Sequence, residues 1–180
     1  LNLQDAVLVS YHRSRLQQTV AGAGKMLATG LGLQDARAYI ARREQLVSVG
    51  AINSPGAVPL SGDADALAEI AAELEEKGIF NRFLQVEVPY HSPHMEPLKE
   101  EMREVLRNLQ PQPPSVPLYS TVTGCLVEGR IHDAEYWCNN MREPVLFAEA
   151  VSNILEQGHL GFLEVGPHPV LANSIKEALR

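Results

Sequence analysis

The chain of 180 residues is 45% hydrophobic and 21% charged, which is the balance of an ordinary globular domain with a sizeable core. Its net charge of −7 argues against a nucleic-acid partner, because phosphate binding needs clustered lysine and arginine. The sequence contains neither an apolar run that could cross a bilayer nor a signal peptide, so we expect a cytoplasmic protein that is not bound to a membrane.

The first predicted element is a helix over residues 2–18, with Asn2 as its cap and Asp5 in its first turn. Leu1 stands directly inside this helical pattern, and no initiator methionine precedes it. We therefore interpret Leu1 as a truncation point, with a processed mature chain as the alternative.

Residues 24–89 predict short strands that alternate with helices. The predicted strands cover residues 25–29, 46–52, 57–60 and 83–88, and the predicted helices cover residues 33–43 and a segment between the cap Asp63 and the terminator Gly78. The order β-α-β-β-α-β is that of the split βαβ, or ferredoxin-like, arrangement.

Beyond Tyr90 the predicted helices become longer, which indicates a second structural unit. Helices are predicted over residues 93–109, 134–140 and 147–157 and from Pro169 onward, and buried strands over residues 116–120 and 161–165. Strands that alternate with helices indicate a parallel sheet. We therefore predict an α/β body, formed by residues 1–23 and 90–180, that is interrupted by a small inserted unit at residues 24–89.

His91 follows a predicted strand and stands just before a helix that Ser92 caps and Pro93 opens. The positive end of the helix dipole disfavours a protonated imidazole there, and a general base needs a neutral histidine near pH 7. The same position also fits a histidine that only packs or hydrogen-bonds at the end of a strand.

A metal site is not expected. His94 follows His91 by three residues, but no further histidine, cysteine or acidic ligand follows at a helical interval. Cys125 and Cys138 indicate neither a disulfide framework nor a zinc site.

Three further features allow a functional and a bland interpretation. Arg13 stands in mid-helix, where it can hold a carboxylate in a cleft or can simply be solvated. The turn at residues 53–56 needs no role other than to connect two strands. His168 follows a predicted buried strand, where α/β proteins place functional loops, yet it can also be a structural hydrogen-bonder. No G-x-S-x-G pentapeptide occurs, so the sequence contains no nucleophile elbow.

Several stretches carry a family signal through their order along the chain. They are Asp5-Ala6-Val7, Tyr11-His12-Arg13-Ser14-Arg15, Ile52-Asn53-Ser54-Pro55-Gly56, Leu60-Ser61-Gly62, Val88-Pro89-Tyr90-His91-Ser92-Pro93-His94-Met95, Tyr119-Ser120-Thr121-Val122-Thr123-Gly124, Tyr136-Trp137, Arg142-Glu143-Pro144-Val145 and Glu164-Val165-Gly166-Pro167-His168-Pro169-Val170-Leu171. Together they resemble the acyltransferase (malonyl-CoA:acyl-carrier-protein transacylase) family. The residues in these motifs are more similar to those of modular polyketide synthases than to those of the free-standing bacterial enzyme.

The resemblance implies a hydrolase-like α/β body with a ferredoxin-like insert. It also implies a two-step reaction in polyketide or fatty-acid biosynthesis. A serine takes malonyl from coenzyme A and passes it to the phosphopantetheine thiol of an acyl carrier protein. The implied partners are that carrier protein, the coenzyme A thioester and neighbouring synthase domains such as a ketosynthase. No covalently bound cofactor is implied.

The resemblance also assigns roles to individual residues. His91 is the base, and Asn140 falls where a backbone carbonyl orients its ring. Arg13 falls where an arginine grips the free carboxylate of malonyl. Tyr90 is the bulky residue before the base, which favours malonyl over methylmalonyl.

Asn53 and His168 are further candidates to line the site. Since the elbow serine is absent, we expect this chain alone to be inactive and to expose apolar faces. Two other functions stay open at this point: a non-catalytic module that binds a carrier protein, and a serine hydrolase of the same body plan.

Overall fold

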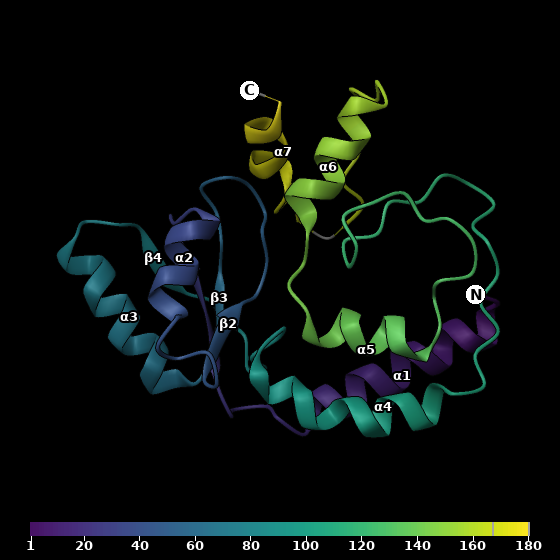
Figure 1. The fold of residues 1–180 in the computed structure, drawn as a ribbon, viewed down its shortest axis with the longest axis horizontal. Helices are drawn as coiled ribbons and strands as arrows, with labels where there is room; N and C mark the ends of the chain where they lie inside the picture. The colour runs from purple at the N-terminus through teal and green to yellow at the C-terminus, as the bar shows by residue number, and fades with distance from the viewer. Residues whose placement is uncertain (167, 180) are drawn as a thin grey trace.

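The computed structural model describes residues 1–166 and 168–179. Its elements form two groups that lie side by side (Figure 1). One group, the sheet unit, is a four-stranded sheet with two helices. The other, the helical unit, is built around α1 (Leu3–Gln18), α4 (Lys99–Leu106) and α5 (Ala134–Arg142). The helices α6 (Phe147–Glu156) and α7 (Ala172–Ala178) lie together beyond these groups.

The sheet unit follows the predicted order of elements. Its strands are β1 (Lys25–Thr29), β2 (Val47–Val49), β3 (Leu60–Gly62) and β4 (Asn81–Phe83), with α2 (Leu33–Ile40) after β1 and α3 (Ala64–Glu76) after β3. The order across the sheet is β2-β3-β1-β4, and each neighbouring pair is antiparallel. The helix α3 begins and ends where predicted, because Asp63 accepts hydrogen bonds from the amides of Asp65 and Ala66 and Gly78 takes a φ of 65°.

The bounds of β3 and β4 differ from the prediction. The strand β3 lies at residues 60–62 rather than 57–60, because Pro59 has no amide to donate to a ladder. The strand β4 ends at Phe83, and one further bond continues its ladder, from the Leu84 amide to the Met26 carbonyl at 2.9 Å. The alternation of apolar residues marks which way side chains face, but the hydrogen-bond partners decide where a strand begins and ends.

The two faces of the sheet have different uses. One face packs against α2 and α3 in a core of fully or nearly fully buried residues, among them Leu27, Val47, Leu60, Leu67, Ile70 and Leu74. Burying each such side chain stabilises the fold by about 1.5–3 kcal/mol. Because side chains alternate along a strand, the intervening residues Met26 and Ser48 face the other way, toward the helical unit.

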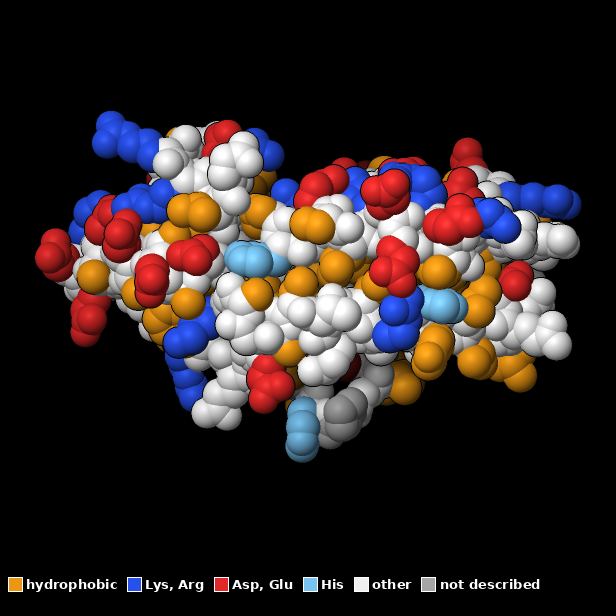
Figure 2. Space-filling view, turned by 90° about the horizontal axis from the view of Figure 1, so that it is seen from below, with side chains coloured by type: hydrophobic (Ala, Val, Ile, Leu, Met, Phe, Trp, Pro, Cys, Tyr) orange, Lys and Arg blue, Asp and Glu red, His pale blue; other side chains and the backbone are white. Residues whose placement is uncertain are grey.

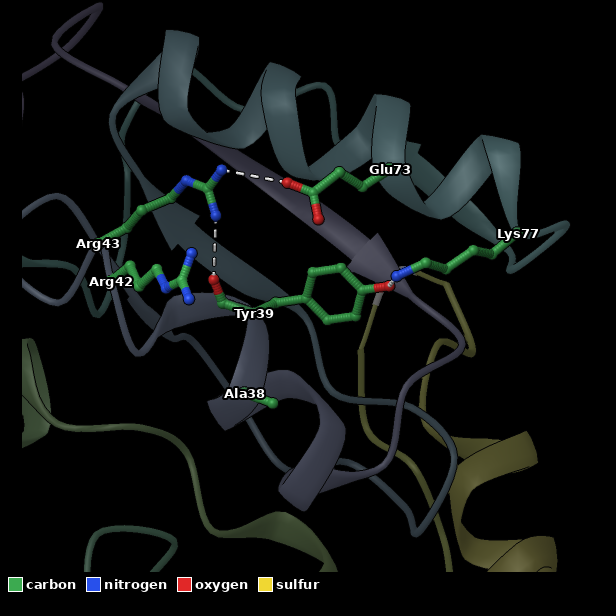
Figure 3. A pocket seen from close by; sticks show the side chains of 6 residues that line it. All are labelled: Ala38, Tyr39, Arg42, Arg43, Glu73 and Lys77. Atoms are coloured by element: carbon green, nitrogen blue, oxygen red, sulfur yellow. Dashed lines mark hydrogen bonds and ion pairs between the residues drawn. The ribbon is translucent and has the colours of Figure 1, made fainter.

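Polar side chains tie α2 to α3 on the outside of the sheet unit (Figure 3). Arg43 donates to Glu69 and Glu73, both at 3.1 Å, and Lys77 donates to the Tyr39 hydroxyl at 2.8 Å. Tyr39, Arg43, Glu73 and Lys77 line a surface cavity of about 610 Å³. Arg43 is paired with two carboxylates and Lys77 is bonded to a hydroxyl, so we interpret the network as a link between the α2 and α3 regions.

The helical unit has a core of its own, whose fully buried members are Met95, Met102, Leu106, Cys138 and Met141. The helix predicted over residues 93–109 is divided into a 3₁₀ segment, η1 (Pro93–Leu98), and α4, which ends at Leu106. Pro97 lies inside η1 and has no amide to donate to an α-helical ladder, which accounts for the division.

The predicted strands at residues 116–120 and 161–165 are not strands in the structure. Tyr119 makes only an isolated bridge with Leu126, and Leu163 and Val165 are 88% and 89% exposed. A buried strand needs neighbouring strands, and the described residues provide none for these segments. The parallel sheet predicted from them is therefore absent from the described part of the chain.

The last helix also differs from the prediction, because α7 begins at Ala172 rather than at Pro169. Pro167, which belongs to the motif of residues 164–171, lies outside the described residues.

Within the described part of the chain, none of the helices is both long enough and apolar enough to cross a membrane. One face of the molecule mixes acidic, basic and apolar side chains, and no basic patch dominates it (Figure 2).

Candidate active site

A cavity of about 520 Å³ lies where the second face of the sheet meets α1. Four residues singled out from the sequence line this site cavity: Arg13 from α1, Asn53, Tyr90 and His91. The sequence separates Arg13 from His91 by the whole sheet unit, and the fold brings the two side chains to one space. A base and a carboxylate-binding group that serve one ligand need this arrangement.

The backbone of His91 is in an uncommon conformation. Its φ is 59°, and among the described residues no other residue except glycine has a positive φ. An L-residue in this left-handed region costs about 1–2 kcal/mol. Such strain persists only where surrounding contacts hold it, and it is frequent at functional sites.

The ring of His91 is oriented by one hydrogen bond. Its Nδ1 lies 2.8 Å from the carbonyl oxygen of Glu143. Because a carbonyl can only accept, Nδ1 carries the proton and donates. The neutral ring therefore keeps a lone pair on Nε2, which is the atom that a general base uses.

The surroundings of His91 favour the neutral ring. Burial is the first cause that lowers the pKa of His91, and the charges of Arg13 and Arg142 lower this pKa further, while the bond to Glu143 opposes them. The predicted cap at Ser92 is observed, since its hydroxyl accepts from the His94 amide at 3.2 Å. Burial, rather than the dipole of the short η1, is thus the leading cause of neutrality.

The resemblance implied that the carbonyl of Asn140 orients His91, and the structure gives this role to Glu143 instead. Asn140 is a residue of α5, whereas Glu143 is the C-cap of that helix in an extended conformation, so its carbonyl points away from the helical ladder. The side chain of Asn140 lines a neighbouring cavity of about 450 Å³, which also contacts Arg13 and Trp137.

The segment after α5 is fixed to both units. Val145 forms a parallel bridge with Ala51, with bonds from the Val145 amide to the Gly50 carbonyl at 3.1 Å and from the Ile52 amide to the Val145 carbonyl at 2.8 Å. Arg142 forms an ion pair with Glu96 at 3.1 Å. These contacts fix the position of the Glu143 carbonyl.

Arg13 is half-buried and carries a charge that the described residues do not neutralise. It forms no ion pair with any of them, and its Nε has no hydrogen-bond partner there. Burial lowers the pKa of Arg13, an effect that Tyr90 opposes, yet an arginine keeps its proton at neutral pH. The planar guanidinium therefore suits an anionic ligand, above all a carboxylate.

Two residues at the site were not singled out from the sequence. Gln17 is only 4% exposed and lines the site cavity one helical turn after Arg13, a spacing that could have indicated it. Ser48 donates to the His91 carbonyl from a distant strand, and no local pattern predicts that contact. His168 is exposed on the segment between α6 and α7.

The chemistry open to the site is that of a neutral histidine and an unpaired arginine. The described residues contain no group of three or more His, Cys, Asp or Glu side chains placed to hold a metal ion. A ligand with a carboxylate at one end and an acyl group within reach of His91 fits these two side chains.

Comparison with known proteins gives consistent matches. The family described as "Acyl transferase domain" matches residues 1–180. Polyketide synthase GfsB of Streptomyces halstedii is 40% identical over 180 residues, which are 99% of this chain and 3% of that protein. Erythronolide synthase EryA2 of Saccharopolyspora erythraea is 37% identical over 179 residues, which are 99% of this chain and 5% of that protein.

Solved structures agree. The acyltransferase domain from module 8 of the salinomycin polyketide synthase superimposes with a TM-score of 0.95 at 35% identity, over 98% of this chain and 42% of that one. The malonyl CoA-acyl carrier protein transacylase of Clostridium perfringens has a TM-score of 0.89 at 24% identity, over 99% and 58%, which shows a shared fold. The chain thus spans a small part of the curated relatives and about half of these structures.

Proposed function

The chain belongs to the acyl transferase domain family, and on that basis we propose that it is part of an enzyme that moves a malonyl-type group from coenzyme A to an acyl carrier protein. The observation that carries this proposal is the shared cavity of His91 and Arg13. The carrier of the acyl group in the second half-reaction is the phosphopantetheine thiol. The setting is a polyketide or fatty-acid synthase with neighbouring domains such as a ketosynthase, in the cytoplasm.

In the proposed reaction His91 moves a proton twice. Its Nε2 takes the proton of a serine hydroxyl, the serine oxygen bonds to the thioester carbon, and the carbon–sulfur bond to coenzyme A breaks. The departing thiolate then takes the proton from His91. The same steps in reverse order, with the phosphopantetheine thiol as nucleophile, return the serine to its free form.

The serine is not part of this chain, since no elbow pentapeptide occurs in it. We infer that it comes from a segment outside residues 1–180. Exposed apolar side chains support this inference, because Leu3, Val7 and Tyr11 form one stripe along α1 and the unpaired segment with Leu163 and Val165 is apolar too. Surfaces of this kind fit further strands of the enzyme.

The two groups of elements fit the two parts of such a domain. We interpret the sheet unit, within residues 24–89, as the ferredoxin-like insert, because its order β2-β3-β1-β4 with antiparallel pairs suits that fold. Residues 1–23 and 90–180 are then part of the hydrolase-like body. The parallel sheet of that body would lie against α1 and the unpaired segments.

Arg13 gives the site its preference for a diacid. A malonyl group presents a free carboxylate that a guanidinium can hold with two parallel hydrogen bonds. An acetyl group would leave the half-buried charge of Arg13 unpaired, and an unpaired buried charge is costly. Tyr90, on the same cavity, would crowd a methyl branch and so favour malonyl over methylmalonyl.

Isothermal titration of the 180-residue chain with malonyl-CoA and with acetyl-CoA tests this function. Malonyl-CoA should bind more tightly, and Arg13→Ala should remove the difference. Arg15→Ala is the matched control, since Arg15 lies on the same helix but pairs with Glu101 at 2.6 Å. Equal binding of both thioesters by the unaltered chain would contradict the proposal.

Two rival functions give other results. A module that only docks a carrier protein would bind the carrier but show no preference between the two thioesters. A hydrolase would release free acid from the acyl-enzyme when the serine-bearing segment is supplied, whether or not a carrier protein is present.

A further inference from the structure

The strand β2 places one side chain against the main chain of a site residue. Its residues Val47 and Val49 are buried in the core against α2 and α3, so Ser48 between them faces the opposite way. The Ser48 hydroxyl donates to the carbonyl oxygen of His91 at 2.7 Å, across 43 residues of sequence. A strand anchored in one core therefore holds the main chain of a residue in the site cavity.

This hydrogen bond holds the main chain of His91, the residue with the strained backbone conformation. His91 has a φ of 59°, and in this conformation its ring meets the Glu143 carbonyl. A change of φ would move the Cβ and the ring relative to that carbonyl. Ser48 fixes the main-chain end of the residue, and Glu143 fixes the ring. Without the hydrogen bond from Ser48, the backbone is free to return to an ordinary φ and to carry the ring away from Glu143.

We propose that Ser48 is a positioning residue that holds the strained backbone of His91 and so keeps the ring in place for proton transfer. The catalytic meaning of this hydrogen bond rests on the proposed function, whereas the bond itself does not. The charged groups that face the ring are Arg13 from α1 and Arg142 from the end of α5, and neither is on the strand that carries Ser48.

The test follows the His91 ring by NMR in the 180-residue chain with labelled histidine. The signals of His91 are identified by their absence in His91→Gln. In the unaltered chain the ring should titrate below the ordinary histidine value, with a slowly exchanging proton on Nδ1. In Ser48→Ala the ring should leave its buried position. Its pKa should then rise toward the ordinary value, because burial lowers this pKa more than the bond to Glu143 raises it, and the Nδ1 proton should exchange rapidly.

Two further variants keep the result interpretable. Ser48→Thr retains the hydroxyl and should restore both signals, which also covers the case in which Ser48→Ala folds poorly. Ser61→Ala removes the hydroxyl directly across the ladder, on the same face but without a hydrogen-bond partner in the described residues, and should change neither signal.

A His91 pKa and Nδ1 exchange rate that are the same in Ser48→Ala as in the unaltered chain would overturn the proposal. An altered pKa and exchange rate that Ser48→Thr does not restore would overturn it too. Because no substrate is present, these results are independent of the acyltransferase assignment, which fails or stands on the thioester titration.

Discussion

The Nδ1 of His91 donates to the carbonyl oxygen of Glu143 at 2.8 Å, across 52 residues of sequence. This bond joins the residue two before η1 to the C-cap of α5, and it leaves the lone pair of Nε2 available on a residue that lines the site cavity. The predictions below concern the protonation and the backbone of His91, and the selectivity that we propose for its neighbours Tyr90 and Arg13.

Stability should depend on pH through His91. Burial holds its folded pKa below the value near 6.5 of an unfolded chain, so between those values the unfolded chain binds more protons. Its contribution to stability is therefore complete above pH 6.5 and is lost as the pH falls.

Urea unfolding at several pH values measures this contribution. His91→Gln should show a smaller loss of stability on acidification than the unaltered chain. The pKa of His132 is also lowered by burial, so some dependence should remain. An identical pH dependence in the variant and the unaltered chain would exclude His91 as its source.

The conformation of His91 can be tested by stability alone. Asparagine tolerates the left-handed region, whereas a β-branched residue does not. His91→Val should therefore be less stable than His91→Asn by about 1–2 kcal/mol, which is a difference in Tm of about 2–8 °C for a domain of this size. Equal melting temperatures would argue against the left-handed backbone.

The size of Tyr90 should set the response to a methyl branch. Tyr90→Ala opens space beside His91, so the chain should bind methylmalonyl-CoA more tightly relative to malonyl-CoA, by about 1–2 kcal/mol. Calorimetry with both thioesters measures the ratio. Tyr90→Phe keeps the ring and should keep the original preference; a shift of the same size in this variant would rule out the steric explanation.

The chain alone should not form an acyl-enzyme. Incubation with radiolabelled malonyl-CoA, followed by denaturation and scintillation counting, should leave no stable label, because the covalent path needs a serine that this chain lacks in an activating context. Stable labelling would show that a nucleophile is present after all, and peptide mapping would identify it.

Local patterns predicted α1 and the order of elements in the sheet unit, but not the bounds of β3 and β4. The caps Asn2 and Asp63, the terminator Gly78 and the alternation of apolar residues gave α1, α3 and the order of elements, since each depends on neighbours in sequence. The strands at residues 116–120 and 161–165 were wrong for the opposite reason. An apolar run becomes a strand only beside other strands. A local sequence pattern does not show whether such partner strands are present.

The site shows the same division. His91 and Arg13 were found through their motifs, and the structure places them on one cavity. The carbonyl that orients His91 was assigned to Asn140, three residues before Glu143, because a motif does not show where a helix releases its last carbonyls. Ser48 escaped notice because its hydrogen bond to His91 arises only when β2 is folded against the site.

One titration shows directly whether His91 and Arg13 bind the same diacid ligand. Malonyl-CoA is added to the labelled 180-residue chain while the His91 imidazole signals are followed, and the addition is repeated with acetyl-CoA and with Arg13→Ala. Malonyl-CoA should shift the His91 signals, acetyl-CoA should do so far less, and Arg13→Ala should abolish the difference. Equal shifts with both thioesters, or a malonyl-CoA response that survives Arg13→Ala, would contradict this prediction.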